Sequence, residues 1–373
     1  MPSKTRKAAA QASYQQGERK NFIRNGDMAI AQRSTQSIAA SGFAIGAVDG
    51  WKMYMGSAAA VDASQDAESP DAFNNSLKLD ITTADTSVAA GDIAYIEQRF
   101  EGLDLQSINK GDAQAKAVTA SFWVRSPVTG IHIVELLDLD NSNRSSSQSY
   151  TIASADTWEY HSVTFPPDTT GALDDDNAGS MKIQFWLIAG STYSGGGSLN
   201  TSWGTTTNTR AVGQVNVLGD ASDNFYLTGV QMELGNTATD FQYESFKENL
   251  SRCQRYFVAY GASGTDATDD YVVIGTGVAG GTTHSWIEIN PPTPMRARPS
   301  ATLNNVYIYD SANRFLGSIT YYSVEDGTVY RAKQTIWIRV VNVGGGTNTT
   351  AGNGAQLYTN AATDSYFWLS AEL

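Results

Sequence analysis

Disulfides and membrane-spanning segments are both missing from this sequence. It holds one cysteine in 373 residues, which excludes an intramolecular disulfide and leaves core size or oligomerisation as the source of durability. No apolar run approaches the ~20 residues that a membrane-spanning helix requires. Charged residues make up only 17% of the chain. We therefore expect a protein that is not inserted into a membrane and carries no internal cross-link.

Residues suited to catalysis are also scarce. The single thiol, Cys253, falls on an apolar stripe, where a buried structural role is expected. The three histidines, His132, His161 and His284, lie in strand-like runs. No spacing singles out a pair of carboxylates for glycoside hydrolysis, and the G-x-G match at 275–277 lacks the strand-turn-helix context of a nucleotide site. The sequence therefore predicts no catalytic residue, no cofactor and a protein that is not an enzyme.

Basic residues are few and unevenly placed, with 25 Lys or Arg against 38 Asp or Glu. Residues 1–20 have a net charge of +4, residues 21–250 one of −16, and residues 251–373 one of −1. So acidic a middle segment repels phosphate backbones, which argues against nucleic acid as a partner. The acidity favours solubility, or cation binding in salty surroundings.

Glycine is abundant, at 34 residues against nine prolines, and Ser, Thr and Asn are frequent. This composition is typical of short strands joined by polar turns and predicts an all-β protein. Between residues 21 and 244, about eight strand-like runs with long connections fit a jelly-roll β-sandwich. The predicted strands are Trp51–Met55, Asn75–Ile81, Ala94–Phe100, Ala117–Arg125, His132–Leu137, Tyr160–Phe165, Lys182–Ile188 and Phe225–Glu233.

A change of pattern follows the jelly roll. Phe246, Leu250, Cys253 and Phe257 share one stripe, which predicts a short linking helix over residues 245–258. Residues 259–373 return to strand-like runs and predict a second, smaller β-sandwich. Its many tyrosines can bury their rings across a subunit interface while their hydroxyls stay wet.

Residues 1–20 form a basic segment, rich in alanine and glutamine, that cannot build a core alone. No apolar core follows its basic residues, so no secretory signal peptide is predicted. Two interpretations stay open: a disordered leader, or a short anchoring segment of helix-forming residues that orders against an acidic surface of a larger assembly. In the second, the attraction comes from five side chains: Lys4, Arg6, Lys7, Arg19 and Lys20.

A polar loop with aromatic side chains is a candidate sugar-binding surface, because pyranose faces stack on flat rings and amides bind the hydroxyls. The stretch 190–204 sets Tyr193 and Trp203 among Gly, Ser, Thr and Asn residues, where a ring exposes a large apolar area. We therefore predict a glycan site at Tyr193, Asn200 and Trp203. The alternative is that Trp203 folds back on its own sandwich or packs on a neighbouring subunit. Four tryptophans within strand runs are predicted core residues: Trp51, Trp123, Trp158 and Trp186.

Two acidic turns, at 138–143 and 174–177, place oxygen ligands at the short intervals that calcium requires. Neither has the full EF-hand pattern with its glycine and terminal glutamate, and solvated turns are the alternative interpretation. The sequence therefore predicts no metal site.

Several motifs recur in a fixed order along the chain. N-x-I-x-N-G-D-M at 21–28 is followed by Q-R at 32–33 and D-x-W at 49–51. Next come Q-R-F at 98–100, S-F-W-V-R at 121–125 and W-E-Y-H-S-V-T-F at 158–165. The run Q-x-E-x-G-x-x-A-T-x-F at 231–241 then precedes C-Q-R-Y-F at 253–257 and P-M-R-A-R-P at 294–299.

This ordered set resembles bacteriophage tail-fibre and minor tail proteins, in which a carbohydrate-binding-module-like jelly roll closes with the Q-x-E run. The resemblance implies four parts: an attachment segment at 1–20, a jelly roll at 21–244, a linking helix at 245–258 and a tip or trimerisation domain at 259–373. Some similar jelly rolls hold a structural calcium through a glutamate and an aspartate. Ala29 and Thr228 stand in those places, so the resemblance does not carry a calcium site over.

The function implied is that of a virion fibre or appendage subunit that attaches to a host surface by glycan binding. It would be a homotrimer, assembled in the host cytoplasm and joined to tail or baseplate proteins through its N-terminal segment. Three weak sugar sites on one tip would then raise avidity by effective concentration. Two alternatives stay open: an architectural head-fibre or tail-decoration protein without receptor affinity, and a polysaccharide depolymerase.

Overall fold

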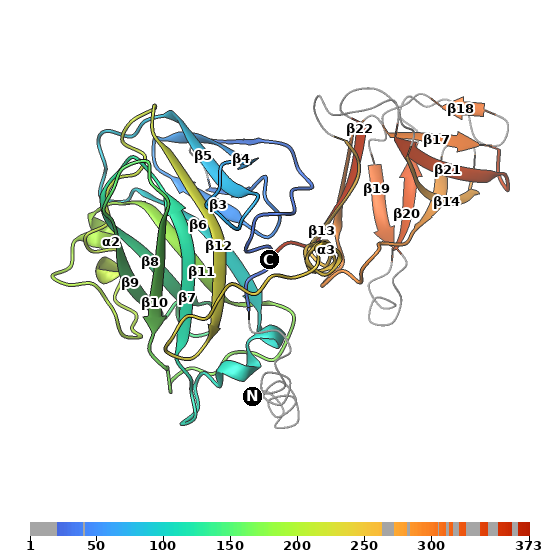
Figure 1. Ribbon diagram of the computed structural model, residues 1–373. Coiled ribbons are helices and arrows are strands. Elements are labelled where there is room, and N and C mark those ends of the chain that lie inside the picture. The colour runs from blue at the N-terminus through green and yellow to red at the C-terminus, as the bar shows by residue number, and fades with distance from the viewer. Residues whose placement is uncertain are drawn as a thin grey trace. The chain divides into compact units, whose positions relative to one another are not determined.

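The computed structural model describes residues 21–39, 42–262, 272–281, 284–304, 306–310, 313–315, 321–325, 336–341, 350–359 and 365–373 (Figure 1). The predicted attachment residues Lys4, Arg6, Lys7, Arg19 and Lys20 lie outside them. Contacts divide the chain into two compact units. The first holds the described residues up to Ala31, Thr35–Asn249 and Leu373, and the second holds Gln32–Ser34 and Leu250–Glu372.

The first unit is a jelly-roll β-sandwich of two six-stranded antiparallel sheets, which confirms the predicted fold class. Sheet A has the order β1 (Gln36–Ile38), β4 (Ala60–Asp66), β5 (Ser76–Thr83), β12 (Asn224–Leu234), β7 (Val118–Arg125) and β10 (Glu159–Phe165). Sheet B has the order β2 (Gly42–Ile45), β3 (Lys52–Gly56), β6 (Ile93–Glu101), β11 (Gly179–Ala189), β8 (Gly130–Asp138) and β9 (Ser145–Ile152).

One apolar core fills the space between the sheets. On β7 the side chains of Ala120, Phe122 and Val124 point into it, and the period of two therefore turns Ser121 and Trp123 to the outer face of sheet A. Full burial of a side chain such as Phe122 contributes roughly 1.5–3 kcal/mol. The outer face of sheet A is left to polar and aromatic residues, and it holds the site described below.

Four strands of the sandwich were not predicted, namely β1, β2, β4 and β9. The sequence of β9, Ser145–Ile152, is mostly serine and threonine, yet Ser145, Ser146 and Ser147 are buried. β1 and β2 are only three and four residues long, and the apolar residues of β9 are confined to its last three positions, so the period-two signal of a strand is weak in them. The expected eight strands are therefore twelve.

The opening motif of the chain is structural. The Met232 N–H donates to the Asn21 side chain at 2.9 Å, and the Val230 N–H donates to the Gly26 carbonyl at 2.9 Å. A Cβ atom on Gly26 would lie 2.1 Å from the Val230 carbonyl oxygen, so only glycine permits this approach. Asn25 adopts a φ of 50°, which asparagine tolerates. The motif thus fastens the start of the domain to β12.

The predicted linking helix is shorter than expected. Helix α3 (Phe246–Gln254) begins with a capping box, in which the Ser245 hydroxyl donates to the Glu248 carboxylate at 2.7 Å. It ends before β13, so the helix does not extend to residue 258. Cys253 is buried as predicted, but Phe246 at the other end of the stripe is 65% exposed. No helix among the residues described is both long and apolar enough to cross a bilayer.

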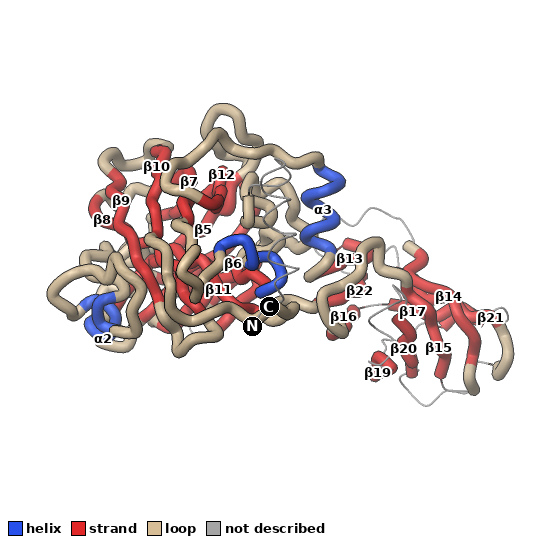
Figure 2. Tube along the Cα trace, turned by 90° about the horizontal axis from the view of Figure 1, so that it is seen from below, coloured by secondary structure: helices blue, strands red, loops and turns tan. Residues whose placement is uncertain are grey.

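The second unit is a smaller β-sandwich, as predicted (Figure 2). One sheet has the order β13 (Phe257–Ala262), β22 (Ser365–Ser370) and β16 (Ser300–Asn304). The other has the order β18 (Asn313–Phe315), β17 (Val306–Asp310), β21 (Gly354–Thr359), β14 (Val273–Ala279), β15 (His284–Ile289), β20 (Ile336–Val341) and β19 (Tyr321–Glu325). Val258, Ile287, Leu357 and Phe367 belong to its buried core.

Candidate functional site

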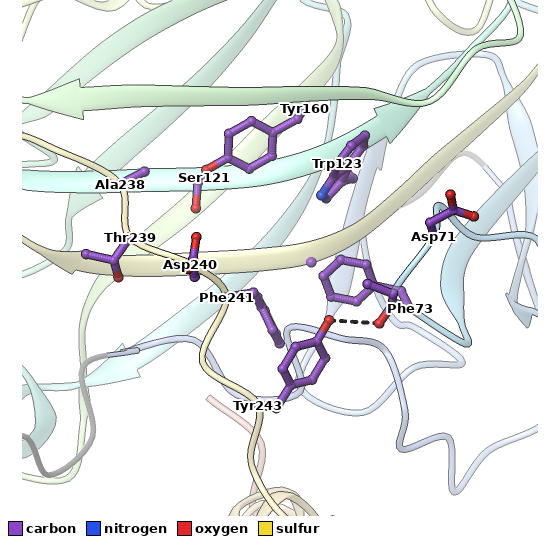
Figure 3. A pocket seen from close by; sticks show the side chains of 12 residues that line it. Asp71, Phe73, Ser121, Trp123, Tyr160, Ala238, Thr239, Asp240, Phe241 and Tyr243 are labelled. Atoms are coloured by element: carbon purple, nitrogen blue, oxygen red, sulfur yellow. Dashed lines mark hydrogen bonds between the residues drawn. The ribbon is translucent and has the colours of Figure 1, made fainter.

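A pocket of about 430 Å³ opens on the outer face of sheet A (Figure 3). Its volume falls within the range of small-molecule sites. Three separate parts of the chain build it: residues 71–73, strands β7, β10 and β12, and residues 238–243. Five of its lining side chains are aromatic: Phe73, Trp123, Tyr160, Phe241 and Tyr243.

Trp123 and Tyr160 form one wall of the pocket. They are register partners on the antiparallel strands β7 and β10, and their ring centroids lie 5.5 Å apart. The alternation of β7 places Trp123 outward because Phe122 and Val124 occupy the core. Tyr160 is 47% exposed. This wall therefore offers a ring surface that a ligand can reach.

Gly229 makes room for the rings. It lies where β12 departs from regular register against β7, between Thr228 and Gln231, and its φ is +60°. A Cβ atom there would lie 2.7 Å from Phe73 Cζ and 3.0 Å from Trp123 Cδ1. The irregularity and the missing side chain together allow both rings to approach the strand.

Phe73, Phe241 and Tyr243 form the facing wall. The Phe73 centroid lies 5.0 Å from that of Phe241, and the Phe241 centroid lies 4.9 Å from that of Tyr243. Both pairs have the edge-to-face geometry that aromatic rings favour. The Tyr243 hydroxyl donates to the Ala72 carbonyl at 2.7 Å, the dashed line in Figure 3. The loop at 71–73 and the segment carrying Tyr243 are thereby joined.

Two buried side chains of β12 hold residues 235–243, which we call the strap, against sheet A. Glu233 Oε1 accepts the Thr239 N–H at 2.8 Å, and Glu233 Oε2 accepts its hydroxyl at 2.9 Å. Gln231 Oε1 accepts the Gln242 N–H at 2.8 Å. These bonds place Phe241 beside Phe73. They give a physical reason for the Q-x-E-x-G-x-x-A-T-x-F run, whose polar members anchor the strap and whose phenylalanine completes the pocket.

Charge in the pocket has one sign. Asp71 and Asp240 line it and are exposed, and none of the lining residues is Lys, Arg or His. Burial, and after it the nearby Asp27 carboxylate, raise the pKa of the Tyr243 hydroxyl above its ordinary value. Aromatic faces together with carboxylate acceptors suit a polyhydroxylated ring, because the faces take its C–H surface and the oxygens accept from its hydroxyls.

The predicted glycan residues lie elsewhere, and none of the three lines the pocket. Tyr193 packs with its ring centroid 5.6 Å from that of Trp186, beside β11. The Asn200 amide donates to the Ser145 carbonyl at 3.1 Å. Trp203 packs against the sandwich core, and its Nε1–H donates to the Pro166 carbonyl at 2.7 Å.

This loop thus has Trp203 folded back on its own sandwich, the alternative noted above. Lys110 adds to the packing, with its ammonium 5.0 Å from the centroid of the Trp203 ring. Glycan binding by Tyr193, Asn200 and Trp203 stays a prediction, since their contacts within the chain do not test it.

Two of the four tryptophans predicted as core residues are buried, Trp51 at 1% and Trp186 at 0% exposure. The prediction for Trp123 is wrong, because it is half-buried and faces the pocket. Trp158 is also half-buried, with its Nε1–H donating to Glu68 at 3.3 Å. The alternation in S-F-W-V-R was the available signal, since Phe122 and Val124 share one face and leave Trp123 on the other.

The first acidic turn considered for calcium, residues 138–143, is occupied by the ammonium group of Lys110. The Lys110 ammonium contacts Asp138 and lies 3.1 Å from Asp168 Oδ2. Asp138 Oδ1 also accepts the N–H groups of Asp140 at 2.9 Å and Asn141 at 3.0 Å. The oxygens of Asp138 therefore bind the Lys110 ammonium and two backbone N–H groups of the same chain. Thr228 stands where some similar jelly rolls have a calcium-binding carboxylate. Its hydroxyl donates to the Asn75 carbonyl at 2.7 Å.

No family model and no curated protein sequence matches the chain. Among solved structures, CBM4 is 15% identical and covers 57% of this chain and 99% of its own, with a TM-score of 0.31. The C-terminal family 22 carbohydrate binding module of Clostridium thermocellum Xyn10B is 11% identical over 52% of this chain and 92% of its own, with a TM-score of 0.30.

The enzymatically active domain of bacteriophage CBA120 tailspike protein 4 is 12% identical, with a TM-score of 0.28. The match covers 58% of this chain but only 21% of the tailspike chain. At these TM-scores, the similarities assign neither a ligand nor an activity to this protein.

Proposed function

We propose that the first unit binds carbohydrate in the pocket on sheet A. The observation that carries this proposal is the convergence of five aromatic side chains and two exposed carboxylates on one open cavity. Three of the rings come from segments outside the sandwich strands, and the buried Gln231 and Glu233 side chains hold one of these segments in place. A site whose supporting contacts are buried keeps its rings positioned before a ligand arrives, which lowers the entropic cost of binding.

The setting that we propose is a virion fibre or appendage, with the protein as a homotrimeric subunit that attaches the particle to a host surface. The ordered motifs from N-x-I-x-N-G-D-M to P-M-R-A-R-P support it, because they resemble tail-fibre and minor tail proteins. In this proposal residues 1–20 join the subunit to tail or baseplate proteins. Three copies of a weak pocket on one fibre would together give the avidity that a single pocket lacks.

Binding of the purified full-length protein to a panel of immobilised bacterial surface polysaccharides tests the proposal. Loss of the exposed ring in Tyr160→Ala should weaken binding about tenfold, because the stacked apolar area is lost. Phe43→Ala is the matched control, since Phe43 is 55% exposed, lies on β2 of sheet B and does not line the pocket. It should bind as the wild type does.

Competition with adsorption of the parent virus tests the virion setting separately. Wild-type protein that binds a polysaccharide and blocks adsorption would support both halves of the proposal. If no polysaccharide binds and adsorption is unaffected, the architectural alternative holds and the pocket is not a receptor site.

A further inference from the structure

The carboxylates of the pocket lack the cationic partners that other charges on sheet A have. Within the described part of the chain, neither Asp71 nor Asp240 takes part in a salt bridge. Lys78, by contrast, lies 2.9 Å from Asp80. The two pocket carboxylates are therefore available to a cation that comes from outside the chain.

The basic side chain nearest along β7 is engaged away from the pocket lining. Arg125, the next outward residue after Trp123, lies 5.1 Å from the centroid of the Tyr226 ring. Its Nη2 is 3.6 Å from Asp156 Oδ1, and its Nε donates to the Asp156 carbonyl at 3.0 Å. No lining residue carries a positive charge, so an anionic ligand would meet two carboxylates without a compensating donor cation.

Ring faces add to the attraction for cations. The negative face of an aromatic ring attracts an ammonium within about 6 Å of its centroid. Tyr160 is 47% and Tyr243 56% exposed, and Figure 3 shows them on opposite sides of the pocket, with Asp240 between the strap and the sheet. Residues 21–250 carry a net charge of −16, which raises the local concentration of cations and lowers that of anions.

We infer that the pocket selects an amine-bearing sugar over its N-acetylated and acidic counterparts. This inference rests on the proposed carbohydrate-binding function and names its substrate class. The sugar's C–H face lies on an aromatic wall, and an ammonium group is attracted to the Asp71 or the Asp240 carboxylate and to the exposed tyrosine faces. Uronic acids and other anionic sugars are disfavoured by the same carboxylates.

A matched pair of probes isolates the charge. Isothermal titration calorimetry would compare a β-1,4-linked glucosamine hexasaccharide with its fully N-acetylated form, at a pH where amines are protonated and carboxylates ionised. We expect the wild type to bind the amine form at least about tenfold more tightly. Asp71→Asn and Asp240→Asn should each weaken binding of the amine form about two- to fivefold and leave the affinity for the N-acetylated form unchanged.

Asp104→Asn is the control, because Asp104 is exposed, lies outside the pocket and changes the net charge equally. It should bind the amine form as the wild type does. If Asp104→Asn weakens binding of the amine form as much as Asp71→Asn does, the net charge of the whole domain causes the effect, and the inference about the pocket is overturned. Added salt should narrow the preference for the amine, since the carboxylates are exposed.

The outcomes separate this inference from the proposed function. Equal affinity for the two hexasaccharides would overturn the inference while carbohydrate binding stands. The same holds if neither hexasaccharide binds but a surface polysaccharide does and Tyr160→Ala loses it. If no hexasaccharide and no polysaccharide binds, both proposals fail.

Discussion

The Glu233 carboxylate accepts two hydrogen bonds from Thr239, one from its N–H at 2.8 Å and one from its hydroxyl at 2.9 Å. Glu233 is only 2% exposed; the Gln231 amide on β12 also donates to it at 2.9 Å, and the strap supplies the donors from Thr239. Two residues beyond Thr239, Phe241 enters the pocket. A single pair of residues thus couples the end of a core strand to an aromatic wall of the site.

Thr239→Val should therefore affect stability and binding together. Valine keeps the shape and the N–H but removes the donor to Glu233 Oε2, and losing a hydrogen bond to a buried charged group costs about 1.5–3 kcal/mol. Urea unfolding measures this loss, and titration with a bound polysaccharide should show weaker binding because Phe241 is less firmly held. Thr237→Val, also on the strap but exposed, is the control. A Thr239→Val protein with unchanged unfolding and binding would contradict the role assigned to this pair.

Gly229→Ala should fill part of the pocket with a methyl group and displace the Phe73 and Trp123 rings. Its φ of +60° is strained for alanine, and the new Cβ atom would lie 2.7 Å from Phe73 Cζ. We expect a destabilisation of about 1–3 kcal/mol from strain and displaced rings. Thermal unfolding measures the cost, and Gly91→Ala is the control because a Cβ atom there meets nothing within 4 Å. Equal melting temperatures for the two variants would show that the rings do not depend on Gly229.

The fold class was predictable because it depends on local signals. Alternating apolar residues in runs such as Ala117–Arg125, and the glycine- and asparagine-rich turns between runs, recur along the whole chain. Strand β9 was not predicted, because its buried residues include three serines, Ser145 to Ser147. Their burial is a property of the sheets around them and leaves no hydrophobic period in the sequence.

The pocket was not predictable from spacing, because it joins residues 71–73, 121, 123, 160, 229, 238–241 and 243. Only the pairing order β5-β12-β7-β10 brings them together. Trp123 had a strand signal, and a tryptophan in a strand is usually assigned to the core. The alternation with Phe122 and Val124 places Trp123 on the opposite face of the strand, and that pattern outweighs residue type here. The polar loop around Trp203, by contrast, has a composition that can be read from a single stretch of sequence.

Arg210→Met should loosen the loop that carries Tyr193 and Asn200. Arg210 donates to both oxygens of Glu135 at 2.8 and 2.9 Å, and Glu135 is fully buried. Removing the arginine leaves the buried carboxylate without its ion-pair partner, at a cost of about 3–5 kcal/mol, although Gln184 Nε2 and Trp186 Nε1 still donate to it at 2.6 and 3.1 Å. Urea unfolding and limited proteolysis of the loop measure the change.

The double variant Glu135→Gln with Arg210→Met should recover part of that stability, because no charge is left unpaired. Arg125→Met is a matched control, since its partner Asp156 is 55% exposed, and it should cost less than about 1 kcal/mol. The Arg210 guanidinium also lies 5.3 Å from the Trp186 ring centroid and 5.9 Å from that of Tyr193. A double variant as unstable as Arg210→Met alone would indicate that this packing, and not the charge, holds the loop.

Acid should destabilise the first unit through His132 before most carboxylates protonate. Its side chain is fully buried, its Nε2–H donates to the Val128 carbonyl at 3.0 Å, and its ring stacks on Tyr150. Burial above all, opposed by the hydrogen bond to the Val128 carbonyl and assisted by the nearby His161, lowers the pKa of His132 to about 4. The unfolded chain, with an ordinary pKa of about 6.5, therefore binds this proton more readily than the folded chain does.

The sign of the effect follows. Stability is fully present above the unfolded pKa and falls as the pH drops from about 6.5 towards 4, by on the order of 3 kcal/mol at the acid limit. His132→Phe keeps a ring beside Tyr150 and removes the titration, so its unfolding free energy should change less between pH 6.5 and 5 than that of the wild type. His161→Phe tests the smaller contribution, because burial also lowers the pKa of His161. Parallel pH profiles for wild type and His132→Phe would assign the acid sensitivity to other groups.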